Sequence, residues 1–186
     1  MIRIISGSRK GRKITAPSSL PVRPPTDFAK EGLFNVLINR LDFEEIKVLD
    51  LFAGTGNISY ELASRGCKNI TCVDSDSRCL KFIMETSTLL EFPKFKTIRS
   101  DAFAFIKSAK GKWDFIFVDP PYEQKDTTGT IPKLIFEAGM LEPGGLLVIE
   151  HPDRTYFTDA SHMLETRKYG KVHFSFFGMP EKDNES

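Results

Sequence analysis

Between residues 47 and 150, short apolar runs alternate with segments of helical length, and this alternation restricts the possible folds more than any other feature. The apolar runs predict five strands, at 47–52, 69–74, 95–99, 113–118 and 145–150. The segments around them predict helices at 57–65, 76–90, 101–109 and 130–139. Because the strands are apolar throughout, both faces of their sheet should be covered. The sequence therefore predicts an α/β fold with a doubly wound, mostly parallel sheet.

The segment before this alternation predicts an N-terminal extension. Two β-type runs, 3–5 and 12–15, flank a turn that contains glycine and serine, which predicts a basic β-hairpin. Residues 17–25 include four prolines and predict an extended linker. Apolar residues at helical spacing then predict a helix at 28–41.

The end of the chain predicts a different kind of strand pairing. The β-type runs 164–167 and 171–177 flank a turn, so we expect a closing antiparallel hairpin that brings the sheet to seven strands. The domain organisation predicted from these elements is a hairpin and linker over 1–25, an α/β domain over 26–178 and a polar tail over 179–186.

Positive charge is concentrated near the N-terminus. Of 26 basic and 25 acidic residues, residues 1–30 contain seven basic and one acidic, so the remainder holds 19 basic and 24 acidic. A basic arm on a mildly acidic body indicates a polyanionic partner, although a charge run can also be only a solvated surface. Interleaved isoleucines favour a folded hairpin. Its cations, with one from the linker, are predicted to contact nucleic-acid phosphates: Arg9, Lys10, Arg12, Lys13 and Arg23.

Cysteine usage and hydropathy favour a cytoplasmic protein. Cys67, Cys72 and Cys79 suggest neither a disulfide framework nor a paired zinc site, so we expect reduced thiols and no metal. The polar, basic N-terminus lacks the apolar core of a signal peptide. No apolar run approaches the roughly 20 residues that a membrane span requires.

A turn rich in glycine, DLFAGTG at residues 50–56, follows the first strand of the predicted sheet. Its glycines let the backbone approach a ligand closely, and the next helix presents free N–H groups there. At the carboxyl end of a parallel strand this indicates a ligand site, although a tight turn without a ligand has the same pattern. Ser59 replaces the third glycine of a dinucleotide fingerprint, which argues against NAD. Asp50 suits a positively charged group, such as an ammonium or a sulfonium.

Further acidic residues follow the second and third strands of this sheet. Asp74 lies 20 positions after Gly54, where a carboxylate can accept hydrogen bonds from both ribose hydroxyl groups. Asp101 could accept a hydrogen bond from an adenine amino group. Each could instead cap the next helix, although Asp76 is the better candidate for the helix after Asp74.

The sharpest motif is Asp119-Pro120-Pro121-Tyr122, directly after the fourth strand of the sheet. The prolines hold the chain extended and remove two donors, which leaves the Asp119 carboxylate and the Pro120 carbonyl as acceptors. Tyr122 adds an aromatic face. This set can stack on a planar base and accept both hydrogens of its exocyclic amine. Such hydrogen bonds make the nitrogen more pyramidal and free its lone pair to attack a methyl donor. A rigid proline turn with an unrelated aspartate is the alternative.

Together these motifs resemble a known enzyme family. DLFAGTG, Asp74, Asp101 and DPPY, in this order, are similar to class I S-adenosylmethionine-dependent methyltransferases that methylate amino groups. The arm IISGSRKGRKI, the linker VRPPTDFAKEGLFN and the closing KYGKVHFSFF narrow the resemblance to bacterial 16S ribosomal RNA guanine-N2 methyltransferases of the RsmD type. The likeness spans nearly the whole chain and implies a Rossmann-like sheet of seven strands. The linker departs from the family at RPPTD, where a polar residue or threonine is expected after the first proline, and at FAKE, where many members carry arginines.

The resemblance implies a role for each motif. The methionine end of S-adenosylmethionine would be held by Asp50, Phe52, Ala53, Gly54, Thr55 and Gly56. Its ribose would be bound by Asp74, and its adenine by Asp101 and Ala102. The target amine would be bound by Asp119, Pro120, Pro121 and Tyr122. The implied partner is 16S ribosomal RNA, within a small ribosomal subunit or its assembly intermediate, and we expect a monomer.

Two other functions remain open at this point. DPPY alone does not separate guanine from adenine, so an adenine-N6 methyltransferase acting on RNA or DNA is an alternative. Protein glutamine methyltransferases resemble Asn-Pro-Pro-Tyr instead, and Asp119 counts against them. A non-catalytic RNA-binding module with a retained cofactor fold is the other alternative, although the intact glycine loop and DPPY argue against a loss of catalytic activity.

Overall fold

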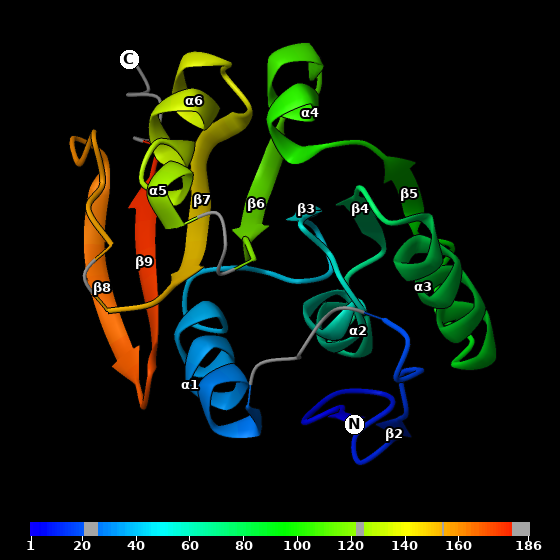
Figure 1. Cartoon of the computed structure of the whole chain (residues 1–186). Helices are drawn as coiled ribbons and strands as arrows, with labels where there is room; N and C mark the ends of the chain where they lie inside the picture. The colour runs from blue at the N-terminus through cyan, green and yellow to red at the C-terminus, as the bar shows by residue number, and fades with distance from the viewer. Residues whose placement is uncertain (21–25, 122–124, 154, 180–186) are drawn as a thin grey trace, which may run out of the picture.

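A seven-stranded sheet forms the centre of the molecule (Figure 1). The computed structural model describes residues 1–20, 26–121, 125–153 and 155–179, so most of the predicted linker and tail lie outside it. The strands of the sheet are β3 (Lys47–Leu51), β4 (Asn69–Asp74), β5 (Lys96–Arg99), β6 (Trp113–Val118), β7 (Leu141–His151), β8 (Met163–Tyr169) and β9 (Val172–Gly178). Their order is β5-β4-β3-β6-β7-β9-β8, parallel as far as β7 and antiparallel beyond it. The predicted sheet and its closing hairpin are confirmed.

Helices cover both faces of this sheet. They are α1 (Asp27–Leu37), α2 (Asn57–Ser64), α3 (Ser77–Leu89), α4 (Ala102–Ser108), α6 (Ile131–Glu137) and a short α5 (Lys125–Thr128) that the sequence does not predict. Successive strand residues enter different hydrophobic clusters because side chains alternate across a strand. Phe115 and Phe117 pack with α1 and α2, whereas Ile116 and Val118 pack with α4 and α6. The doubly wound arrangement is therefore confirmed.

Two elements differ in length from their prediction. Helix α1 ends at Leu37 and not at residue 41, because the Arg40 N–H donates to the Leu37 carbonyl, three residues back, in a tighter turn. Strand β7 begins at Leu141, four residues earlier than predicted. Leu141 pairs with Trp113. A shift in register between β6 and β7 then accommodates the glycine-containing residues that follow, whose composition is typical of a turn.

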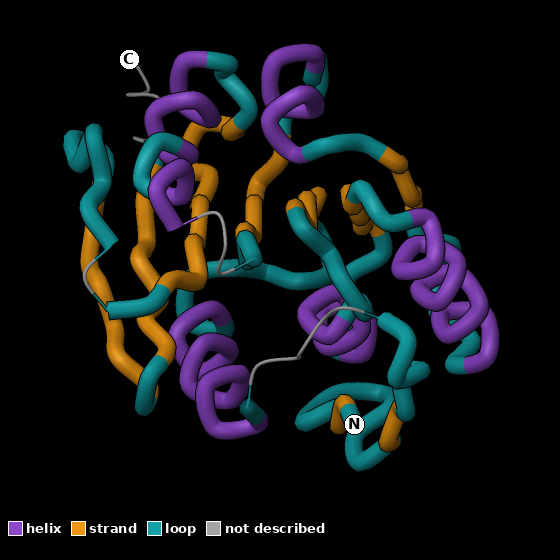
Figure 2. Tube along the Cα trace, viewed as in Figure 1, coloured by secondary structure: helices purple, strands orange, loops and turns teal. Residues whose placement is uncertain are grey.

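The N-terminal hairpin packs beside α2 (Figure 2). Strand β1 (Ile2–Arg3) pairs with β2 (Lys13–Ile14), which confirms the hairpin with shorter strands than predicted. Ile2, Ile4 and Ile14 are buried in the same hydrophobic cluster as the inner faces of α1 and α2. The isoleucines that interrupt the basic sequence therefore fix the arm to the body.

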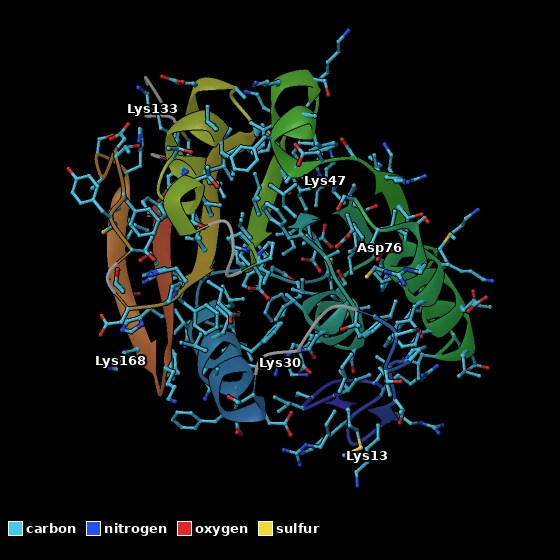
Figure 3. All side chains as sticks on the ribbon, viewed as in Figure 1. Lys13, Lys30, Lys47, Asp76, Lys133 and Lys168 are labelled. Carbon is cyan, nitrogen blue, oxygen red and sulfur yellow. The ribbon has the colours of Figure 1, made fainter. Side chains whose placement is uncertain are left out.

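A buried ion pair joins this hairpin to two helices. Glu61 on α2 accepts hydrogen bonds from the backbone N–H groups of Ile5 and Ser6, at 2.8 and 3.0 Å. The Lys30 ammonium on α1 lies 3.5 Å from Glu61 and donates to the Arg3 carbonyl at 2.6 Å. The side chains of Lys30 and Glu61 are 1% and 0% exposed. Figure 3 labels Lys30 where α1 faces the arm.

Gly7 and Gly11 form a matched pair for testing this docking. Both have a left-handed backbone, with φ of +82° and +83°. A Cβ on Gly7 would lie 1.8 Å from the Ser64 carbonyl oxygen, whereas a Cβ on Gly11 would meet no described atom within 4 Å. Gly11→Ala should therefore lower the free energy of unfolding by about 1 kcal/mol, and Gly7→Ala should lower it clearly more. Urea unfolding of both variants measures the difference, and equal losses would contradict the docked arrangement.

Candidate active site

The predicted site residues gather at one edge of the sheet. The carboxyl ends of β3, β4, β5 and β6 share that edge because the four strands are parallel. After β3 the chain adds β4 and β5 on one side, and then returns to add β6 on the other side. Ligands of open α/β sheets bind at such a reversal of strand order.

The glycine loop turns sharply between β3 and α2. Gly54 and Gly56 have positive φ angles of 53° and 78°, a conformation that glycine adopts without steric cost. A Cβ on Gly56 would lie 2.9 Å from both Ile83 and the Tyr60 ring, so this position also needs glycine for space. Phe52 is a non-glycine residue with φ of 64°, which is strain of the kind found at ligand sites.

Hydrogen bonds fix this loop to β4. The Ala53 N–H donates to the Val73 carbonyl at 3.0 Å, and Gly54 N–H donates to the Asp74 carboxylate at 2.8 Å. The other oxygen of Asp74 accepts from Asp76 N–H at 2.8 Å. Asp76 caps α3, as predicted, so Asp74 is not the helix cap. Its role toward a ribose stays a prediction.

Asp50 is a buried acid beneath the loop. Its carboxylate accepts a hydrogen bond of 2.6 Å from the hydroxyl of Ser59 on α2. Burial, with a smaller contribution from the charge of Asp74, raises the pKa of Asp50 to about 6. Ser59 therefore has a use that the sequence did not indicate: it satisfies Asp50 at the position where a dinucleotide fingerprint has glycine.

Asp119 lies directly after β6, next to the end of β3. Its backbone N–H points to the Leu51 carbonyl at 3.4 Å. Burial and the negative charge of Asp50 raise the pKa of Asp119 well above the ordinary value of an aspartate. Asp119 lines a narrow pocket with Pro120 and Pro121, whereas Tyr122 lies outside the described residues, and the binding of a target amine by this motif stays a prediction.

Glu150 also lines this pocket, although no sequence motif points to it. It lies at the end of β7, beside β6. Burial and the charge of Asp119 raise its pKa. In the described part of the chain its Oε2 atom is buried and has no hydrogen-bond partner. The sequence contains one indication of it: an acid ends the apolar run GLLVIE, and the strand formed by this run lies next to the strand that leads to Asp119.

His151 has a structural role, although it lies beside this pocket. One ring nitrogen, Nδ1, donates to the Pro152 carbonyl at 2.9 Å, so Nε2 accepts from the Ser175 hydroxyl at 2.8 Å. Burial lowers the pKa of His151. Both ring nitrogens of this neutral imidazole are occupied by protein partners, which leaves neither to act on a substrate.

Asp101 caps α4. Its carboxylate accepts a hydrogen bond from Ala104 N–H at 2.9 Å, which confirms the helix-cap interpretation. The side chain is exposed and only one of its two oxygens makes this bond. Ala102 is buried in the first turn of the same helix. The predicted contact of Asp101 with an adenine is compatible with the cap and stays a prediction.

The cations of the arm fall into two groups. The Arg9 guanidinium is held by the body, since it donates to the Leu90 carbonyl at 2.7 Å and pairs with Glu91 at 2.9 Å. Lys10, Arg12 and Lys13 are exposed and point to solvent, and Figure 3 shows Lys13 at the outer edge of the arm. Arg23 lies outside the described residues.

The described residues contain neither a group of metal ligands nor a helix that could cross a membrane. In these ranges, no group of three or more histidine, cysteine, aspartate or glutamate side chains is arranged to hold a metal ion. Among the same residues, no helix is both long and apolar enough to pass through a lipid bilayer.

Comparisons with known proteins identify relatives of this chain. A Bacillus subtilis protein named "Putative rRNA methyltransferase YlbH" is 38% identical over 154 residues, which cover 81% of this chain and 82% of the relative. "Ribosomal RNA small subunit methyltransferase D" of Escherichia coli (strain K12) is 31% identical over 149 residues, or 80% of this chain and 74% of that protein.

A solved structure has the same fold. The structure titled "Putative methyltransferase yhhF from Escherichia coli" superposes with a TM-score of 0.82 and 24% identity, and covers 97% of this chain and 99% of that chain. The family described as "Conserved hypothetical protein 95" matches residues 2–178, which include the arm, the glycine loop and the DPPY motif. The chain is therefore a member of the Conserved hypothetical protein 95 family.

Proposed function

We propose that the protein transfers a methyl group from S-adenosylmethionine to the exocyclic N2 amine of a guanine in 16S ribosomal RNA. The observation that carries this proposal is the position of Asp119, a half-buried acid with a raised pKa, at the reversal of strand order and beside Asp50. The names of the relatives support a ribosomal RNA substrate. Such an activity would place the protein in the cytoplasm, with the ribosomes.

The residues of the site fit S-adenosylmethionine. Asp50 and Glu150 are buried acids and Asp119 is half-buried, and none of the three forms an ion pair within the described residues. A positively charged sulfonium would therefore be stabilised there. The glycine loop and Asp74 would hold the methionine end and the ribose, and Asp101 and Ala102 the adenine. When bound, this cofactor supplies an electrophilic methyl group.

Asp119 would orient the target amine. Its carboxylate and the Pro120 carbonyl would accept the two N–H groups of guanine N2, which favours a pyramidal nitrogen with an available lone pair. As the new N–C bond forms, N2 loses one proton, and the raised pKa makes Asp119 a suitable acceptor for it. The lone pair of guanine N2 attacks perpendicular to the base plane, where stacked neighbours exclude the methyl donor, so the base must leave the stack to reach this pocket.

The arm would bind the RNA backbone through Lys10, Arg12 and Lys13. Replacing all three with alanine should weaken RNA binding and reduce the slope of log affinity against log salt by about 2, for three single-stranded phosphate contacts. A triple alanine variant of Lys107, Lys112 and Lys133 removes the same charge elsewhere and is the control. Filter binding at several salt concentrations measures the slope, and equal effects of both variants would refute the role of the arm.

One labelling experiment tests the proposed function. The protein is incubated with S-adenosylmethionine labelled in the methyl group and with small subunits that lack the modification, protein-free 16S RNA, or DNA. We expect label on guanine N2 in ribosomal RNA after nuclease digestion. Label on adenine N6 would favour the alternative activity, and cofactor binding without transfer to any of the three would favour the non-catalytic RNA-binding module.

A further inference from the structure

Glu150 has a buried carboxyl oxygen without a hydrogen-bond partner. The residue is 8% exposed, and Oε2 contacts no donor among the described residues. A buried polar atom left in this state is unfavourable by about 1–3 kcal/mol, and few native groups tolerate it without a reason. Glu150 lines the narrow pocket of the DPPY motif, so a base that enters and widens this pocket would supply the missing donor.

The sheet places Glu150 on the same side as the other acids. Along β7, Val148 belongs to the hydrophobic cluster under α1 and α2, and Ile149 belongs to the opposite cluster. The alternation along a strand therefore directs Glu150 to the face that carries α1 and α2. Asp50, two residues after Val48, is directed to this face by the same rule, and its partner Ser59 is on α2. Asp119 and Glu150 interact through their charges, which raises the pKa of Glu150.

Guanine and adenine differ in what they present to a pair of neighbouring acceptors. Guanine has the N1–H donor next to its N2 amine, so the two groups offer adjacent N–H donors. Adenine has an unprotonated N1 next to its N6 amine, and the lone pair of this nitrogen would face the ionised carboxylate of Glu150 and be repelled by it. An acceptor beside Asp119 therefore favours guanine and disfavours adenine, a choice that DPPY alone does not make.

We propose that Glu150 is a specificity-determining residue that accepts a hydrogen bond from the N1–H of the target guanine while Asp119 holds its N2 amine. This inference rests on the proposed guanine-N2 activity and extends it to base selection. The donor N–H groups of the base would also favour the ionised form of both neighbouring carboxyl groups, whose pKa values are raised before the substrate binds.

The test compares guanine with 2-aminopurine, which keeps the 2-amine but lacks the N1–H. Small subunits are reassembled with 16S RNA that carries either base at the position labelled in the experiment above. The wild-type protein should methylate guanine with a kcat/KM about 10- to 100-fold higher than 2-aminopurine. Glu150→Gln should lose most of this preference, because its amide oxygen can accept from the N1–H of guanine and, with the amide turned over, its N–H can donate to the N1 of 2-aminopurine.

The controls separate specificity from folding and from the proposed function. Glu150→Gln has nearly the same shape as the wild type, and calorimetry with S-adenosylmethionine checks that the cofactor still binds. Glu142→Gln changes an acid at the other end of β7 and should keep the wild-type preference. An unchanged preference in Glu150→Gln, or an equal loss for both bases, would overturn the role of Glu150 and leave the guanine activity standing. Label on a base other than guanine in the wild type would overturn both.

Discussion

Asp119→Ala is expected to lower kcat/KM for methyl transfer by about 10²- to 10⁴-fold, the range for losing a group that positions a nucleophile and accepts its proton. Asp119 is the acid of the DPPY motif, next to Asp50 at the edge of the sheet. Cofactor affinity, measured by calorimetry, should change far less because the glycine loop and Asp74 remain. An alanine variant as active as the wild type would exclude Asp119 from the reaction.

Asp119→Asn is the matched variant, because asparagine keeps an acceptor oxygen and loses only the negative charge. Wild-type kcat/KM should rise with pH as Asp119 loses its proton. Since burial and Asp50 raise its pKa, this rise should lie well above pH ~4, the ordinary range of an aspartate. The asparagine variant should be less active, with a shallower rise. A wild-type profile that is flat above pH ~4 would contradict the raised pKa.

Glu61→Ala should lower the free energy of unfolding by about 3–5 kcal/mol, since it leaves the buried Lys30 ammonium without its counter-ion. Burial already lowers the pKa of Lys30, and Glu61 opposes this effect. The same change removes the acceptor of two backbone N–H groups in the arm. Urea unfolding measures the loss, and a value below about 1 kcal/mol, as for a surface pair, would contradict a buried pair.

Glu85→Ala is the control for this prediction. Glu85 pairs with Lys81 on α3, at 3.8 Å, and both side chains are mostly exposed, at 65% and 72%. Its loss should barely change the unfolding curve because exposed ion pairs contribute little. Limited proteolysis provides a second measurement. Glu61→Ala should be cleaved faster within the arm than the control, and equal cleavage would show that Glu61 does not hold the arm.

Much of the fold could be predicted from the sequence because its elements have local signals. All five parallel strands appear where apolar runs predict them, and Asp76 caps α3 as its position before the helix indicates. The start of β7 at Leu141 could not be predicted in the same way. The local composition after Leu141 is typical of a turn, but pairing with Trp113 keeps these residues in the strand.

The candidate site was predicted less completely than the fold. Asp50, Asp74 and Asp119 belong to recognisable motifs, so the sequence places them at strand ends. Glu150 belongs to none, and its importance depends on β7 lying next to β6 in the sheet. Arg9 is the opposite case, because the sequence indicates a free cation and the structure attaches it to Leu90 and Glu91.

The alternation of strands and helices, the two hairpins and the chemistry of the loops follow from the local sequence, because they depend on side-chain period and turn residues within short windows. Which acids share a pocket and which cations remain available depends instead on how the chain packs. Those facts depend on contacts between residues far apart in the chain, such as Lys30 with Glu61 and Asp119 with Glu150. Burial at these contacts also sets the protonation of the acids, and no local pattern encodes it.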